Sequence, residues 1–325
     1  MAFNNSRYVP YAVHIKSITA WINQIKSTAL SMGVSLFEET TGSQTDRAFV
    51  ASRAIDPTVA ISTTDLVALA TMGFGGVSWT GATAVPAEIY ARELPLGGVP
   101  TAVGTTNHIR CSISDGLLVP ISVSGSHNSV ATLNFMLHAL LGSGVSSGAR
   151  PFVFTSGVAI DQTSSPEPAT NNIFVPNTIH YASGASSPAV SPRLVQGILD
   201  MQINFGISVQ KEATDSDVYP NYASIIGRMP SIEFTVRDLA LDIEVGDGIA
   251  TTGFDAYFQA VATNGQRTAK GTGAHVKFTG TTGMITPGSL NLGHKVPAGC
   301  SFTYTPAAAS PCLAISTTST IPTVA

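Results

Sequence analysis

Apolar and polar residues alternate along two stretches of the chain that resemble each other. Positions 57–66 read PTVAISTTDL and positions 230–239 read PSIEFTVRDL, so that both begin with proline and end on Asp-Leu. The second stretch sets the apolar residues Ile232, Phe234 and Val236 against the polar residues Glu233, Thr235 and Arg237. A two-residue period places one set on each face of an extended chain. Both stretches are therefore predicted to be half-buried β-strands.

The similarity continues far beyond these two strands. Between residues 25 and 73, ten positions are identical to those 173 residues later (230 minus 57), where ordinary composition gives roughly three. Residues 108–135 match 275–302 at an offset of 167 (275 minus 108), and 8–14 match 174–180 at an offset of 166 (174 minus 8). The changes of offset correspond to loops that differ in length. The pattern predicts an internal duplication of nearly the whole chain.

Strand predictions follow from comparing the two copies. The stretch ITAWINQIKSTALSM has spacings that suit an amphipathic helix, but its second half aligns with LDMQINFGISVQKE, which alternates strictly. We therefore expect single strands over 28–38 and 201–212. Residues 254–280 have the pattern of a hairpin with a polar, glycine-rich tip. Final strands are expected in SVATLNFML and GCSFTYTPA, and the tail after 307 has no clear pattern.

The strand pattern breaks after Asp65 and after Asp238. The following segments, DLVALATMG and DLALDIEVG, have i, i+4 apolar spacing and end on a shared glycine. A short helix is favoured in each copy, with the aspartate accepting a hydrogen bond from the exposed amides at its start. A β-bulge followed by another strand is the alternative.

The repeat also sets the domain organisation. A chain of 325 residues can form two domains of ordinary size. We expect a mainly β protein with a first domain over 1–145, a Gly/Ser/Pro-rich linker over 146–170, and a second domain over 171–325 that ends in a tail.

Composition adds two expectations about the surroundings of the chain. Only 11% of residues are charged, and no run of eighteen apolar residues or signal-like segment is found. Low charge with a high apolar content favours faces that are covered by other subunits, and a soluble β-rich monomer is the alternative. A membrane span is not expected. Residues 196–250 hold nine carboxylates and three cations, a net −6, whereas the whole chain carries −4. A protein that grips phosphate would show the opposite balance.

Candidate chemistry is sparse. The segment GVSSG at 144–148 fits the G-x-S-x-G pattern of an esterase nucleophile but falls in the expected linker rather than between a strand and a helix. Six of the seven histidines fall into pairs related by the repeat: His14 with His180, His108 with His275, and His127 with His294. A shared packing or hydrogen-bonding role is favoured over paired metal sites. Three cysteines without CxxC spacing indicate reduced structural thiols. We expect no enzyme activity, no metal and no cofactor.

With these elements in place, the chain resembles the tail tube proteins of long-tailed bacteriophages. The resemblance rests on LDMQINFGISVQKE, MPSIEFTVRDL, the 254–280 hairpin and TGTTGMITPGSL. It implies two tandem β-sandwich domains, each with one short helix, whose inner strands join those of neighbours into a closed barrel around a DNA channel. It further implies a virion protein that is made in the bacterial cytoplasm, stacks into a tube and binds other tail proteins. Because this chain carries two domains, a homotrimer with pseudo-sixfold symmetry would replace the usual hexamer.

A conduit for DNA should not hold phosphates tightly, so a polar and weakly acidic lumen is expected. The residues predicted to line the channel in the second copy are Asp200, Gln202, Asn204, Ser208, Gln210, Glu233, Thr235 and Arg237. The matching first-copy positions are the uncharged Ser27, Ala29, Ser31, Ser35, Ala60 and Ser62. A capsid decoration or spike protein, and a secreted carbohydrate-binding module, are the alternative functions.

Overall fold

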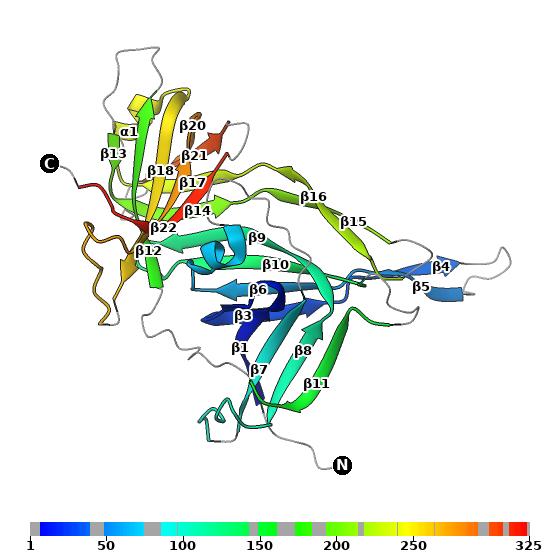
Figure 1. Cartoon of the computed structure of the whole chain (residues 1–325). Coiled ribbons are helices and arrows are strands. Elements are labelled where there is room, and N and C mark those ends of the chain that lie inside the picture. Colours follow the sequence, from blue (N-terminus) through cyan, green and yellow to red (C-terminus); the bar gives the residue numbers. More distant parts are fainter. Residues whose placement is uncertain are drawn as a thin grey trace.

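The described part of the chain folds mainly into antiparallel β-sheets (Figure 1). The computed structural model describes residues 7–39, 49–74, 86–95, 97–142, 149–160, 173–183, 193–213, 218–238, 240–262, 264–291, 299–307 and 312–323. The two similar alternating stretches form β6 (Thr58–Thr63) and β17 (Ser231–Val236), each with its large apolar side chains buried. The prediction of a mainly β protein is confirmed.

Two sheets are formed by the first half of the chain. One has the order β11 (Phe152–Val158), β8 (His108–Ile113), β7 (Ala87–Leu94), β1 (Arg7–Ile15), β2 (Ala20–Ile22). The other contains β9 (Asp115–Ser126), β10 (Thr132–Leu140), β6 and β3 (Ile25–Ser31) in that order. Ile15 and Ile22 of the first sheet and Ile61 and Phe135 of the second are at most 1% exposed and belong to one buried cluster. Burial of each such side chain stabilises the fold by about 1.5–3 kcal/mol.

The strands of the second half pair in the same two orders. One series is β22 (Ala314–Ser319), β19 (His275–Gly280), β18 (Ile249–Val261), β12 (Ile173–Ser183), β13 (Arg193–Val195). The other is β20 (Gly283–Asn291), β21 (Gly299–Pro306), β17, β14 (Ile198–Asn204). Register irregularities also recur at matching positions, between Pro10 and Ala12 in β1 and between Pro176 and Thr178 in β12.

The halves are joined through their second sheets. Strand β14 of the second half pairs with β9 of the first, so that Ile203 lies opposite Val123. The result is a run of eight strands in the order β3-β6-β10-β9-β14-β17-β21-β20, within a sheet that β18 extends toward β12, β13, β19 and β22. Within the described residues this sheet does not close into a barrel, because β3 pairs only with β6.

The single strands expected over 28–38 and 201–212 are wrong, because each is interrupted at a glycine. Gly33 and Gly206 have positive φ angles of 53° and 56°, the left-handed region that glycine tolerates best. Beyond them the chain continues as a separate projecting hairpin. The first arm comprises β4 (Val34–Glu39) and β5 (Phe49–Ile55), and the second arm comprises β15 (Ile207–Glu212) and β16 (Tyr222–Arg228).

Helical structure is confined to short segments in the described residues. A helix, α1 (Ala240–Val245), follows Asp238, and a helical turn, η2 (Ala70–Phe74), follows Asp65. The favoured helix after each aspartate is thus present, although each is shorter than expected. The stretch 18–32, which has helical spacing, forms strands β2 and β3 after a single turn (Lys16–Ile18). In β2 the buried Ala20 and Ile22 alternate with the half-buried Trp21.

Two segments expected to lack structure form strands. Part of the expected 146–170 linker is β11, which pairs with β8, and part of the tail is β22, which pairs with β19. Both strands lie at sheet edges, and local sequence carries little signal for a strand with one neighbour. The predicted hairpin over 254–280 is confirmed, with Phe254 opposite Gly280. The strands predicted in SVATLNFML and GCSFTYTPA correspond to β10 and β21.

Candidate functional site

The eight-stranded run has one apolar and one polar face. In β14 the buried Met201 and Ile203 alternate with Asp200 and Gln202, which are exposed. Strand β6 repeats the pattern, because its Val59 and Ile61 are buried whereas Ala60 is exposed. The apolar side packs into the core and the polar side faces solvent. This polar face is the candidate functional surface.

Six of the eight predicted lining residues lie along β14 and β17. Strand β14 carries Asp200, Gln202 and Asn204, strand β17 carries Glu233 and Thr235, and Arg237 follows β17. Gln202 lies opposite both Glu233 and Ser124. The Gln202 amide donates to Asn204 Oδ1 at 2.9 Å, and the Asn204 amide approaches Glu233 Oε1 at 3.5 Å. These side chains bind one another on a surface that is otherwise open to solvent.

The other two predicted lining residues, Ser208 and Gln210, do not lie on this sheet. They project from β15 in the second arm, which pairs only with β16. Their placement on the same face was wrong because the strand is broken at Gly206. Ser35 of the first copy lies on the first arm for the same reason, broken at Gly33.

Sequence reasoning missed the contribution of β9, β10 and one lysine. Ser122 and Ser124 of β9 lie opposite Asn204 and Gln202, and Asn134 of β10 donates to Ser122 Oγ at 3.1 Å. The regular spacing of the serines in 122–126 was the available signal. Lys26 Nζ also lies here and donates to Thr132 Oγ1 at 2.9 Å. An open hollow of about 450 Å³ between the halves is lined in part by Lys26, Ser124, Thr132, Asp200 and Gln202.

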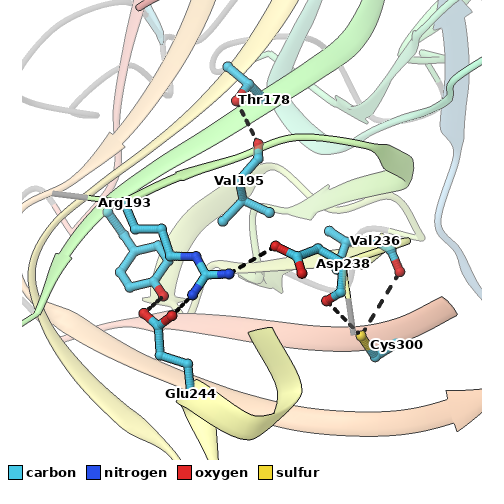
Figure 2. A network of polar contacts seen from close by, with 8 residues as sticks. Thr178, Arg193, Val195, Val236, Asp238, Glu244 and Cys300 are labelled. Atoms are coloured by element: carbon cyan, nitrogen blue, oxygen red, sulfur yellow. Dashed lines mark hydrogen bonds and ion pairs between the residues drawn. The ribbon is translucent and has the colours of Figure 1, made fainter. Parts of the chain in front are cut away.

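The two predicted helix-start aspartates bind differently. Asp65 Oδ1 accepts the Val67 N–H at 3.1 Å, which is the bond of a helix-start cap. The Asp238 carboxylate accepts a bond from Arg193 at 2.8 Å, and Arg193 also pairs with Glu244 of α1 (Figure 2). The Cys300 thiol lies 3.5 Å from the Asp238 carbonyl oxygen. This network fastens β13, α1 and the end of β17 together.

Two repeat-related histidines are fully buried and satisfied. His275 Nδ1 accepts the Ala260 N–H at 3.1 Å, and Nε2 lies 3.0 Å from the Ala269 carbonyl oxygen as its donor. His108 makes the matching bonds with the Glu93 N–H and the Ala102 carbonyl oxygen. Each ring ties the loop before its strand to the neighbouring strand. No group of metal-binding side chains occurs among the described residues.

Replacing His275 with phenylalanine is expected to lower the free energy of unfolding by about 2–4 kcal/mol. The ring volume is kept, but a buried N–H and a buried carbonyl each lose their partner at about 1–3 kcal/mol per group. Urea unfolding followed by circular dichroism measures the change. His127→Phe is the control, because His127 is exposed, and it should change the value by less than about 0.5 kcal/mol. Equal effects would contradict the buried bonding role.

A charged cluster that sequence reasoning missed surrounds Glu88 in β7. This residue is 5% exposed and receives hydrogen bonds or ion pairs from Lys16 at 2.7 Å, Tyr90 at 2.7 Å and Arg110 at 3.3 Å. Burial raises the pKa of the Glu88 carboxyl, but the bonds from Lys16 and Tyr90 and the charges of Lys16 and Arg110 outweigh it, and the pKa is lowered.

A similar cluster occurs in the second half. Asp255 accepts hydrogen bonds from Thr279 at 2.6 Å and from Tyr257 at 3.2 Å, and lies 3.6 Å from Lys277. These residues match the Glu88 cluster at the offset of 167, which was the available sequence signal. The carboxylates are occupied by neighbouring donors, so both clusters serve to hold strands together.

Cys111 and Cys300 are buried free thiols, and burial raises the pKa of Cys111 to about 11. A protonated, enclosed thiol is a poor nucleophile. The GVSSG segment lies outside the described residues.

Comparison with known proteins gives no assignment. No protein-family model matches the chain, and no curated protein matches it. Among the described residues, no helix is long and apolar enough to cross a membrane.

Proposed function

We propose that this chain is a tail tube protein of long-tailed bacteriophages, in which three copies form a ring and rings stack into a conduit for double-stranded DNA. The observation that carries the proposal is the eight-stranded run with a polar face, an apolar face and an incompletely paired strand at each end. An open edge strand exposes unpaired amides and carbonyls, which favour pairing with another chain. Heterologous pairing of one end with the other generates a ring when the rotation closes.

The matching strand orders of the two halves support three chains per ring. Each half supplies four strands to the run, so that three chains would supply six equivalent units and 24 strands. With strands about 4.8 Å apart and tilted by roughly 40° from the barrel axis, the closed barrel would be roughly 45–50 Å across between backbones. Side chains on the polar face narrow this opening, and the remaining lumen is wide enough for a DNA duplex.

The chemistry of the polar face suits the passage of DNA rather than its retention. Serine, asparagine and glutamine side chains predominate between β3 and β14, and the charged groups Asp200, Glu233, Arg237 and Lys26 are mixed in sign. A phosphate-binding surface would need clustered lysine and arginine, whose counterion release adds salt-dependent affinity. In a ring of three chains, sectors with acidic groups would alternate with nearly uncharged sectors from β6 and β10.

The remaining roles follow from the resemblance. The projecting arms and terminal segments would contact neighbouring subunits and the next ring, and other tail proteins would cap the tube. The protein would be made in the bacterial cytoplasm and function in the virion, with no cofactor and no catalytic step.

Electron microscopy of the purified chain tests the proposal. Hollow rings or tubes with threefold symmetry, and a ring mass of three chains by analytical ultracentrifugation, are the expected result. A reconstruction that places Gln202 and Glu233 on the outer wall, or discrete particles that bind only capsids, would overturn it. The latter outcome would favour a capsid decoration or spike protein.

A further inference from the structure

The second half of the chain docks on the first in two ways. Strand β14 pairs with β9, and immediately beyond it the Phe205 N–H donates to the Ile121 carbonyl oxygen at 3.0 Å. The second arm, β15–β16, then runs toward the first half (Figure 1). Near the base of the loop between its strands, the Leu141 N–H donates to the Pro220 carbonyl oxygen at 2.8 Å. Lys211 of this arm pairs with Asp56.

This docking buries apolar residues of the first half. Val123, opposite Ile203 of β14, is 0% exposed, and Leu117, which pairs with His138 near the arm, is 3% exposed. Their counterparts 167 positions later are Leu290 and Met284 of β20, which are 48% and 44% exposed. Leu290 sits where β20 has no strand on its outer edge in the described part of the chain. The second half thus carries a copy of this surface on β20, here called the docking seat, which is half-exposed in the described residues although β18 lies opposite Met284 at its far end.

The first half carries an uncovered copy of the docking arm. Ile207 and Val209 of β15 are half-buried, and their counterparts 173 positions earlier, Val34 and Leu36 of β4, are 50% and 51% exposed. Strand β3 ends the eight-stranded run, as β14 would if β9 were absent. At the β3 end of the run, the β4–β5 arm is not docked on a sheet in the described residues. At the β20 end, the docking seat has no arm packed on it in the described residues.

We infer that β3 and the β4–β5 arm of one chain dock on β20 and β21 of a second copy, in the register that β14 uses on β9. Transferring that register by the two offsets places Ala29 opposite Asn291, Leu30 opposite Leu290 and Ser31 opposite Ser289. The bond between Phe205 and Ile121 becomes one from the Met32 N–H to the Gly288 carbonyl oxygen. The inference deepens the proposed function and rests on it for the closure of the ring.

The partner for both surfaces is a second copy of this chain. The arm and the seat match each other and lie at opposite ends of one run, so a single chain cannot bring its own pair together. The contact differs from the internal one at both partners of the ion pair, because Asp56 is replaced by Met229, which is 82% exposed, and Lys211 is replaced by Glu38. The seat for the arm is therefore more apolar between chains than within one.

Cysteine cross-linking tests the register. Ala29→Cys with Asn291→Cys, in a Cys312→Ser background, places two thiols on the exposed polar face, where directly opposed residues fall within disulfide range. Oxidation is expected to convert most of the chain into covalent dimers and trimers on a non-reducing gel. Gln202→Cys with Ser124→Cys, the equivalent pair within one chain, should close an intramolecular disulfide and serves as the positive control.

The out-of-register pair Ala29→Cys with Ser289→Cys has the same exposure and should cross-link at least tenfold less. More efficient cross-linking of this pair would overturn the inferred register. Rings seen by microscopy in a sample whose Ala29/Asn291 pair stays uncross-linked would overturn the docking while leaving the tube function intact. Covalent species that extend beyond the trimer would support the docking and contradict the three-chain ring.

Discussion

Gly206→Ala is expected to lower the free energy of unfolding by more than about 3 kcal/mol. A Cβ atom at this position would lie 1.9 Å from the Met229 carbonyl oxygen and 2.4 Å from its carbonyl carbon. Both are backbone atoms of the link between β16 and β17, so the clash cannot be relieved by rotating a side chain. The variant must therefore separate β14–β15 from β16–β17, where the Met229 N–H also donates to the Gly206 carbonyl oxygen.

Gly246→Ala is the matched control for this effect. Its φ of 53° is close to the 56° of Gly206, but a Cβ there would meet no atom within 4 Å. The left-handed conformation alone costs about 1–2 kcal/mol for alanine. Urea unfolding of both variants by circular dichroism separates the clash from the backbone strain. Similar losses in the two variants would show that the close approach to Met229 does not restrict this position.

The double substitution Lys16→Met with Arg110→Met is expected to destabilise the protein by about 3–5 kcal/mol. It removes both cations from Glu88, which is 5% exposed, and a buried charge without its partners is strongly destabilising. Adding Glu88→Gln to the double variant should restore most of the loss, because the neutral amide carries no charge to desolvate. Lys26→Met, which removes an exposed lysine, is the control.

The Glu88 contribution to the pH dependence of stability should change sign in the Lys16→Met, Arg110→Met double variant. In the unaltered protein the Glu88 pKa lies below its unfolded value, so its contribution is present above about pH 4.3 and is lost as the pH falls through the folded pKa. Without the cations, burial is left to raise that pKa, and stability should increase as the carboxyl becomes protonated. Unfolding midpoints between pH 7 and about pH 3 measure both slopes. Parallel slopes would mean that Lys16 and Arg110 do not hold Glu88 ionised.

Several elements could be predicted because their signal is local. Strands β6, β14 and β17 alternate strictly, and the strand at β10 was predicted together with its counterpart in the second copy, β21. The candidate face was found to the extent that it lies on β14 and β17. It was misplaced at Ser208 and Gln210, since the same alternation continues past Gly206 while the backbone turns away from the sheet.

By itself the sequence determined that the chain is mainly β and which side chains of each strand are apolar, because a two-residue period is a local property of an extended backbone. It also indicated which segments of the two halves match. Only the tertiary structure decided that β14 pairs with β9 and that Lys16 and Arg110 both contact Glu88. It also decided that apolar residues of the β4–β5 arm and of the docking seat on β20 are exposed. The physical reason is that a strand edge presents the same amides and carbonyls whatever its side chains are. The partner of an edge is therefore chosen by residues far away in the sequence.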